Sequence, residues 1–362
     1  MVFVPPFKRR GEMVEISLCM IVKNEEDVLA RCLDCVKDIV DEIIIVDTGS
    51  TDHSKDIALK YTDKVFDFEW VDDFSKARNE SFAYATKDYI LWLDADDIID
   101  KENQKKLLEL KTTLNTSIDV VMMKYMINDE LVFYRERLLK REKGFQWQNA
   151  VHEVIEVKGN IIYQDIQIEH HKEKINDANR NLRIYEKQMK AGKVFHTREM
   201  FYYARELYEH QQYDKAINIF QTYLSKTDGW VENQIEACLD MAICFDMINK
   251  RSEALQILFY SFLYDLPRSE ILCEIGHLFL KNKQYHQAIY WYQQALKQKP
   301  QIEKGGFIQL PCYDFIPYIQ LCVCYDRLNN QKKAQYYNEL AGQIKPQHPS
   351  FLHNQKYFES IT

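Results

Sequence analysis

Four carboxylates directly follow the five apolar residues of the segment YILWLDADDIID, residues 89–100: Asp94, Asp96, Asp97 and Asp100. Acids two positions apart at a strand end repel one another unless a cation lies between them, and hard divalent cations prefer oxygen ligands. We therefore expect Asp94 and Asp96 to hold Mg²⁺ or Mn²⁺ together with a diphosphate. The alternative is a set of helix-capping and solvent-facing acids, and Asp100 fits that role before a helix beginning near Lys101.

Alternating strands and helices must position these acids. Continuous Ile, Val and Leu runs predict strands at 15–22, 41–47, 64–70 and 88–97. Helical spacing occurs between them, at 25–38, 51–62 and 73–86. This alternation predicts a parallel sheet covered on both faces, and such sheets bind ligands beyond the carboxyl ends of their strands. Asp47 and the acids at 94–97 are therefore expected at one crevice. Residues 118–171 predict a less regular, mixed extension of the sheet.

Three segments together resemble the family 2 glycosyltransferases, which have the GT-A fold: SLCMIVKNEEDVLARCLDCV, DEIIIVDTGSTDHS and FEWVDDFSKARNESFAYATKDYILWLDADD. The resemblance covers about residues 15–171 and puts Asp94, Ala95 and Asp96 at the D-x-D position of that family. It implies an α/β, Rossmann-like domain with a mostly parallel sheet. It also implies a UDP-sugar donor, UDP-glucose or UDP-N-acetylglucosamine, and a divalent metal.

The resemblance implies roles for the residues that bind the donor. Four residues after the first strand would line the nucleotide pocket: Val22, Lys23, Asn24 and Glu25. Asp47 would bind the uracil ring, and Asp52 would shape its loop. The remaining donor contacts implied are Arg78, Asn79, Asp94, Ala95, Asp96 and Arg180. A turn residue at Asp47 and a surface arginine at Arg78 are the structural alternatives, and Arg180 could instead tie two domains together.

The resemblance also implies the catalytic and metal-binding groups. Glu153 fits the base that takes a proton from the acceptor, and His152 could orient it, contact the donor or be the base itself. His170 would be a third metal ligand beside Asp96 and Asp94. Asp97 and Trp147 are predicted sugar or acceptor contacts. A solvent-side Glu153, a core Trp147 and a merely polar His170 are the alternatives.

From about residue 176 the sequence predicts only helices, and small residues recur there. Four helix pairs are expected from two sets of small residues twelve positions apart: Ala204, Ala242, Gly276 and Cys322, then Ala216, Ala254, Ala288 and Ala334. The pattern resembles tetratricopeptide repeats, which stack into surfaces that commonly bind peptides. We expect a leader at 1–14, a GT-A domain at 15–175, a linking helix at 176–200 and an all-α tetratricopeptide-repeat domain at 201–362.

Catalytic domains joined to such repeats resemble the peptide glycosyltransferases that modify glycocin bacteriocins. We therefore expect metal-dependent, inverting transfer of a hexose from a UDP-sugar to a Ser or Thr hydroxyl or a Cys thiol of a peptide or protein. One alternative acceptor is a cell-envelope glycan or lipopolysaccharide core. An alternative of another class is a non-catalytic repeat scaffold that binds a sugar nucleotide. A homodimer through the repeats is also possible.

Composition limits the partners and the compartment. The net charge of −8 gives no electrostatic support for binding nucleic acid. No apolar run is long enough for a transmembrane helix, so we expect a cytoplasmic protein. The nine scattered cysteines predict buried free thiols, and the Cys32–Cys35 pair lacks a partner pair at zinc-ligand spacing.

Overall fold

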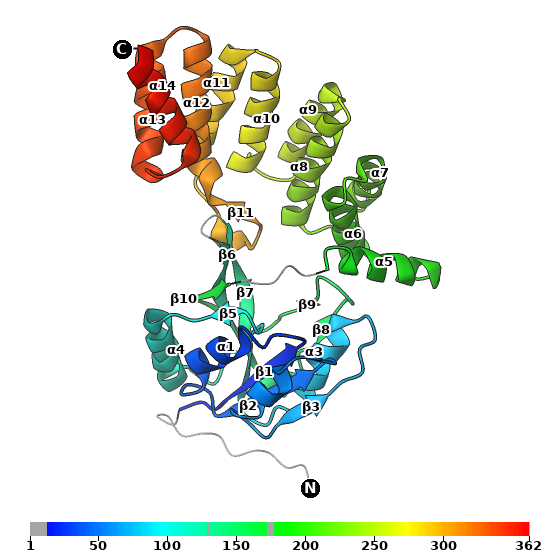
Figure 1. Cartoon of the computed structure of the whole chain (residues 1–362). Helices are drawn as coiled ribbons and strands as arrows, with labels where there is room; N and C mark the ends of the chain where they lie inside the picture. The colour runs from blue at the N-terminus through cyan, green and yellow to red at the C-terminus, as the bar shows by residue number, and fades with distance from the viewer. Residues whose placement is uncertain (1–12, 129–130, 172–176, 362) are drawn as a thin grey trace. The chain divides into compact units, whose positions relative to one another are not determined.

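The computed structural model describes residues 13–128, 131–171 and 177–361 (Figure 1). The chain forms two compact units. The first contains Met1–Asp129 and Tyr134–Ile184, and the second contains Glu130–Phe133 and Tyr185–Thr362. Most of the predicted leader, residues 1–12, lies outside the described residues.

Parallel strands form one half of the sheet in the first unit. They are β1 (Ile16–Val22), β2 (Glu42–Asp47), β3 (Val65–Asp67) and β4 (Tyr89–Trp92). Their order is β3-β2-β1-β4, with each neighbouring pair parallel. Every residue of β4 is buried, as are nearly all residues of β1 and β2, which explains their continuous apolar runs. The predicted parallel core is confirmed.

Four helices accompany these strands: α1 (Leu29–Val36), α2 (Ser54–Ala58), α3 (Phe74–Ala83) and α4 (Lys101–Thr113). In α1 the buried residues Leu29, Cys32, Leu33 and Val36 follow helical spacing, so one face of the helix packs inward. The side chain of Asp100 accepts a hydrogen bond from the backbone N–H of Asn103 at the start of α4. The predicted cap is therefore confirmed.

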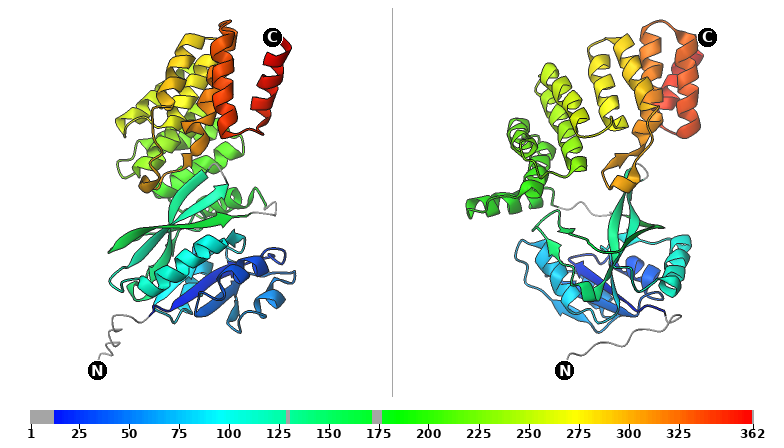
Figure 2. Two further views of the ribbon diagram at one scale, coloured as in Figure 1. Left: turned by 90° about the vertical axis from the view of Figure 1, so that its left-hand side faces the viewer. Right: turned by 180° about the vertical axis from the view of Figure 1, so that it is seen from behind.

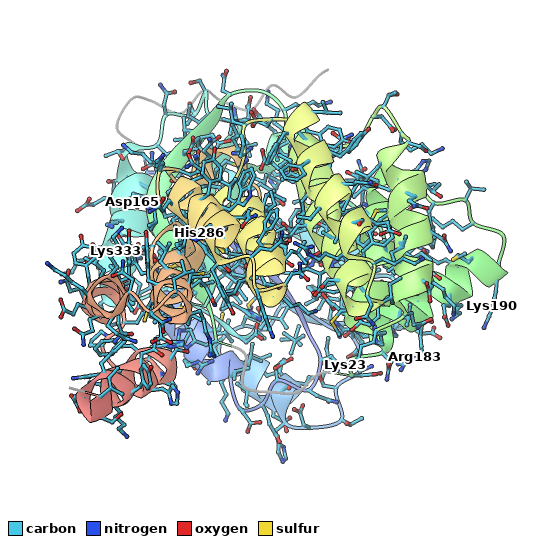
Figure 3. The ribbon with its side chains drawn as sticks, turned by 90° about the horizontal axis from the view of Figure 1, so that it is seen from above. Lys23, Asp165, Arg183, Lys190, His286 and Lys333 are labelled. Atoms are coloured by element: carbon cyan, nitrogen blue, oxygen red, sulfur yellow. The ribbon has the colours of Figure 1, made fainter. Side chains whose placement is uncertain are left out.

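The sheet continues through β7 (Leu131–Lys140), β6 (Val120–Asn128), β10 (Ile161–His170) and β5 (Asp97–Ile98). β7 is antiparallel to β4, and β10 is parallel to β6, so this half is mixed as predicted. A separate pair joins β8 (Trp147–Gln148) to β9 (Val154–Ile155). Asp165 on β10, labelled in Figure 3, is exposed and lies 2.5 Å from the ammonium group of Lys124.

Helix pairs form the second unit, and they follow one another in chain order (Figure 2). The helices in or entering this unit are α5 (Arg180–Lys190), α6 (Thr197–Glu209), α7 (Tyr213–Leu224), α8 (Val231–Met247), α9 (Arg251–Tyr260), α10 (Ser269–Lys281), α11 (Tyr285–Ala295), α12 (Phe315–Arg327), α13 (Gln331–Ile344) and α14 (Pro349–Ile361). The repeated alanines are fully buried where paired helices meet. At Gly276 an added Cβ would lie 2.9 Å from the ring of Tyr292, so any larger residue would force a local shift.

One expectation for this half of the chain is wrong. The segment between α11 and α12 contains a short strand, β11 (Ile308–Gln309), although only helices were predicted. β11 pairs with Leu131 and Val132, which belong to the same unit. Two residues of strand leave no periodic pattern in a sequence, which explains the omission. Among the described residues, no helix is both long and apolar enough to cross a membrane.

Candidate active site and metal centre

The loops after β1 and β2 lie side by side because Val22 pairs with Asp47 in the sheet register. The backbone N–H of Asn24 donates to Ser50 Oγ at 2.9 Å, and Asn24 Oδ1 accepts from the N–H of Thr51 at 2.7 Å. Asn24 itself has a φ of +56°, a left-handed conformation that asparagine tolerates better than most residues. Of the four residues predicted for the nucleotide pocket, Val22 is buried and Lys23 is exposed.

Asp47 is buried at the end of β2, with 4% of its surface exposed. Its Oδ1 accepts hydrogen bonds from the backbone N–H groups of Gly49 and Ser50, both at 2.8 Å. Its Oδ2 is buried and has no hydrogen-bond partner in the described part of the chain. A buried acceptor without a partner is costly unless a ligand supplies the donor. This oxygen therefore fits the predicted contact with a pyrimidine N–H.

Asp52 shapes the same loop through its two carboxylate oxygens. One accepts from the backbone N–H of Glu26 at 3.2 Å, and the other accepts from the N–H of Ser54 at 3.0 Å. The side chain of Ser54 in turn accepts from the N–H of Glu25 at 2.6 Å. These contacts connect the loop after β1 to the start of α2 and fix both around Asp47.

Arg78, on α3, joins two acids that are far apart in sequence. Its Nε donates to Glu153 at 2.6 Å, and its Nη2 donates to Asp94 at 2.7 Å. Burial lowers the pKa of Arg78, but Asp94 and Glu153 outweigh that effect and raise it. Burial raises the pKa of Asp94, but the charges of Arg78 and Arg137 outweigh burial and lower the pKa to about 2. Asp94 is therefore a permanent anion held by arginine.

Asn79 and Trp147 are joined by two hydrogen bonds. Asn79 Nδ2 donates to the Trp147 carbonyl at 3.0 Å, and the Trp147 N–H donates back to Asn79 Oδ1 at 2.8 Å. The Trp147 side chain packs edge-on against Trp92 and is 3% exposed as a residue. These positions fit the core alternative for Trp147 better than a direct sugar contact.

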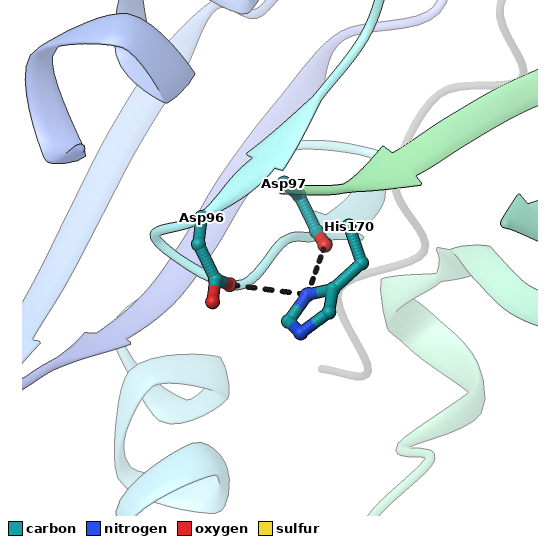
Figure 4. Close-up of side chains that lie close together, drawn as sticks. All are labelled: Asp96, Asp97 and His170. Carbon is teal, nitrogen blue, oxygen red and sulfur yellow. Dashed lines mark ion pairs between the residues drawn. The ribbon is translucent and has the colours of Figure 1, made fainter. Parts of the chain in front are cut away.

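Asp96, Asp97 and His170 form a possible cation site (Figure 4). Nδ1 of His170 lies 3.3 Å from Asp96 Oδ1 and 3.6 Å from Asp97 Oδ1. The antiparallel pairing of β5 with β10 sets His170 directly opposite Asp97. One potential ligand atom from each residue lies within 4.8 Å of the others, so the donor set fits a divalent metal. Asp96, and after it Asp97, raise the pKa of His170 to about 10.

This cluster differs from the predicted one in its acids. Asp97 belongs to it, whereas Asp94 is engaged by Arg78. Asp97 is fully buried and accepts hydrogen bonds from Tyr125 at 3.0 Å and from Arg137 at 2.9 Å. This burial leaves Asp97 no surface for the predicted contact with a sugar or acceptor. Sequence reasoning missed Arg137 and Tyr125.

The loop between β8 and β9 presents Glu153 and His152. Glu153 is partly buried, with 13% of its side chain exposed, and Arg78 holds its carboxylate. His152 has a φ of +50°, so the chain turns sharply just before Glu153. The predicted base is therefore brought to the D-x-D segment through Arg78. Ala95, another predicted donor contact, is buried between Asp94 and Asp96 in the sequence. The guanidinium of Arg180, also predicted, lies 4.6 Å from the ring of Phe74.

A hollow of about 450 Å³ lies at the other end of the strands, where β2 begins. Lysines and acids line it, including Lys37, Glu42 and Lys64. None of the predicted site residues lines this hollow, so the strand ends remain the candidate site.

Comparison with known proteins shows what the first unit is similar to. Residues 17–189 match the family model of glycosyl transferase family 2. A TPR repeat-containing protein of Synechococcus elongatus is 38% identical over 152 residues, which cover 40% of this chain and 36% of that protein. The SPbeta prophage-derived glycosyltransferase SunS of Bacillus subtilis is 34% identical over 149 residues, which cover 40% of this chain and 35% of SunS. The matched region thus spans about a third of the length of these relatives.

A solved structure of glucosyl-3-phosphoglycerate synthase from Mycobacterium tuberculosis, in complex with Mn²⁺ and UDP-glucose, is 16% identical to this chain. The alignment covers 50% of this chain and 80% of that one, with a TM-score of 0.36. A likeness this weak carries no argument about the site.

Proposed function

Because residues 17–189 match the family model of glycosyl transferase family 2, we propose that the protein is a metal-dependent, inverting glycosyltransferase. It moves a hexose from UDP-glucose or UDP-N-acetylglucosamine to a Ser or Thr hydroxyl or a Cys thiol of a peptide. The observation that carries this proposal is the Asp96–Asp97–His170 cluster beside the Arg78 ion pairs, where the parallel strands end.

The nucleotide binds at the ends of β1 and β2. Asp47 Oδ2, buried and without a partner among the described residues, accepts from the uracil N–H. The interlocked loops around Asn24 and Asp52 hold this oxygen in place. Arg180 remains a predicted contact for the diphosphate, since a guanidinium offers paired donors to phosphate oxygens.

Asp96 and His170 hold the metal, with Asp97 completing the cluster from the buried side. When bound, Mg²⁺ or Mn²⁺ offsets the negative charge that develops on the departing UDP. Asp94 stays among the donor contacts. Because its ion pair with Arg78 sets the end of β4, Asp94 also orients the adjacent Asp96.

Glu153 takes the proton from the acceptor hydroxyl or thiol. The ion pair with Arg78 holds its carboxylate at a fixed place relative to the D-x-D segment. The sharp turn at His152 directs Glu153 toward that place, so His152 acts by orienting the base. Attack on the face of the sugar opposite UDP inverts the anomeric centre.

The helical repeats present the acceptor, since stacked repeats of this kind commonly bind peptides. We place the protein in the cytoplasm, because all nine of its cysteines are buried free thiols. A homodimer through the repeats remains a prediction, and sedimentation velocity would test it.

Intact-mass spectrometry of Ser- and Cys-containing peptides incubated with each UDP-sugar and Mn²⁺ tests the proposal. We expect the mass of one hexose or N-acetylhexosamine to be added. Glu153→Gln should bind UDP yet stop transfer, whereas Asp165→Asn, on the exposed side of β10, should transfer normally. Near-normal transfer by Glu153→Gln would make His152 or another group the base. UDP release without a modified peptide would favour a glycan acceptor. Tight peptide binding with no UDP release would favour a non-catalytic scaffold.

A further inference from the structure

The three acids of the turn after β4 have different partners. Arg78 pairs with Asp94 at 2.7 Å, and Arg137 pairs with Asp97 at 2.9 Å. Within the described parts of the chain, no arginine or lysine pairs with Asp96, whose charged neighbour is His170. Two of the three carboxylates are thus paired with arginines, and the middle one faces only His170 among the described residues.

Arg137 occupies an unusual position for an arginine. It is completely buried on β7, and its guanidinium lies 3.8 Å from the centre of the Trp92 ring and 4.3 Å from the centre of the Tyr125 ring. Its Nη1 donates both to the Trp92 carbonyl at 3.1 Å and to Asp97 Oδ2 at 2.9 Å. One nitrogen therefore connects the residue that ends β4 with the acid that begins β5.

Asp97 connects Arg137 to the rest of the turn through further hydrogen bonds. Its Oδ2 also accepts from the backbone N–H of Asp94 at 3.0 Å. Its Oδ1 accepts from the Tyr125 hydroxyl at 3.0 Å and lies 3.6 Å from His170 Nδ1. The backbone N–H of Asp97 donates to the Asp94 carbonyl at 3.1 Å, which closes the turn around Ala95 and Asp96. The position of Asp96 is therefore fixed by a turn whose two ends Arg137 holds.

We propose that Arg137 is a positioning residue for the metal site, acting through Asp97 on the turn that carries Asp96. The inference rests on the proposed function, because it assumes that the Asp96–Asp97–His170 cluster binds a divalent cation. It assigns Arg137 a specific role: the guanidinium holds the Asp97 carboxylate and the Trp92 carbonyl in place without itself contacting donor or metal.

The charges explain why an arginine is needed here. Arg78 and Arg137 supply counter-charges to Asp94 and Asp97, and neither arginine pairs with Asp96. If Arg137 were neutral, Asp97 would be a buried carboxylate without its counter-charge, and the turn would rearrange to relieve that cost. The rearrangement would move Asp96 and Asp97 from the positions at which they face His170.

Two substitutions at Arg137 distinguish the effect of its charge from the effect of its shape. Arg137→Lys keeps a positive charge near Asp97 but lacks the flat guanidinium that fits between Trp92 and Tyr125. Arg137→Gln loses the charge as well. The expected order of Mn²⁺ affinity is therefore wild type, then Arg137→Lys, then Arg137→Gln.

The test is titration calorimetry of the full-length protein with Mn²⁺ and UDP, at a temperature where each variant is folded. We expect Arg137→Gln to weaken Mn²⁺ binding about tenfold or more, the range found when the groups supporting metal ligands are altered. Lys111→Met is the matched control, because it removes another largely buried cation of the same unit, paired with Asp41 where β2 begins. It should lower the melting temperature and leave the Mn²⁺ affinity unchanged.

Each outcome has a defined meaning. Unchanged or tighter Mn²⁺ binding by Arg137→Gln would overturn the role of Arg137 and leave the proposed function intact. A wild type that binds no Mn²⁺ with UDP would overturn both. If Arg137→Gln does not fold, Arg137→Lys supplies the same comparison. Loss of affinity in Lys111→Met equal to that in the Arg137 variants would reduce the effect to general destabilisation and refute the proposal.

Discussion

Replacing Arg78 with glutamine tests whether one guanidinium holds the predicted base and the D-x-D segment together. Arg78 is 11% exposed and contacts Asp94 at 2.7 Å and Glu153 at 2.6 Å. Glutamine can reach one of these acids at most and carries no charge. Both carboxylates would therefore lose their main counter-charge while remaining largely buried.

The loss of stability can be worked out in two ways. The pKa of Asp94 is lowered from 3.8 to about 2, a shift worth roughly 2.5 kcal/mol at neutral pH. Removing one partner of a buried ion pair costs about 3–5 kcal/mol. Because Asp94 is 30% exposed and Arg137 supplies part of its shift, we expect the lower end, about 3 kcal/mol. A depressed folded pKa stabilises above the unfolded pKa, so the share of Asp94 is lost as the pH falls from 3.8 toward 2.

Urea unfolding followed by tryptophan fluorescence measures this loss, since Arg78 lies 4.8 Å from the Trp147 ring and 5.4 Å from the Trp92 ring. The transition of the first unit should move to lower urea in Arg78→Gln. Arg183→Gln, at an exposed arginine paired with Asp177, should leave the transition in place. If the free energy of unfolding changes by less than about 1 kcal/mol, or by as much as in the control, Arg78 does not hold the two acids together. Even a single hydrogen bond to a charge contributes more than that.

Three further predictions concern other parts of the chain. Asp47→Asn should weaken UDP binding about tenfold and reduce its advantage over ADP, measured by calorimetry, because an amide N–H cannot accept from uracil; equal affinities would contradict the nucleotide assignment. Burial raises the pKa of Glu42, but Lys64, Ser17 and Thr86 lower it to about 2. Glu42→Gln should therefore lower the free energy of unfolding by about 3 kcal/mol at pH 7. The variant should also lose less stability than the wild type between pH 4.5 and 2, and an equal loss in that range would contradict this prediction. Gly276→Ala should destabilise the second unit by about 1 kcal/mol in thermal unfolding, because overpacking against Tyr292 exceeds the gain in helix propensity; a rise in melting temperature would contradict this packing.

The strands and the repeats could be predicted because their signals are local. β1, β2 and β4 are buried on both faces, so each appears as a continuous apolar run. The alanines of the repeats are fully buried where helices meet, so their regular spacing records the packing directly. Asp100 follows the same principle, since an N-cap depends only on the next few residues.

The partners of the acids could not be predicted, because they depend on how distant strands pair. Asp97 and Arg137 are 40 residues apart, and the antiparallel pairing of β7 with β4 brings them together. The sequence of β7 predicts a strand that carries charges of both signs, but the pattern does not indicate which of its arginines is buried. For the same reason the choice of His170 over its neighbour depends on the register between β10 and β5.

UDP release from UDP-glucose, measured for the wild type and Asp96→Ala with Mn²⁺ and with excess EDTA, tests whether the protein is a metal-dependent glycosyltransferase with Asp96 as a metal ligand. The wild type should release UDP only with the metal. Asp96→Ala should release it at least about 100-fold more slowly, because the metal supplies several kcal/mol of transition-state stabilisation, and its melting temperature should be unchanged. Release that is insensitive to EDTA, or that proceeds at the wild-type rate in Asp96→Ala, would refute this function.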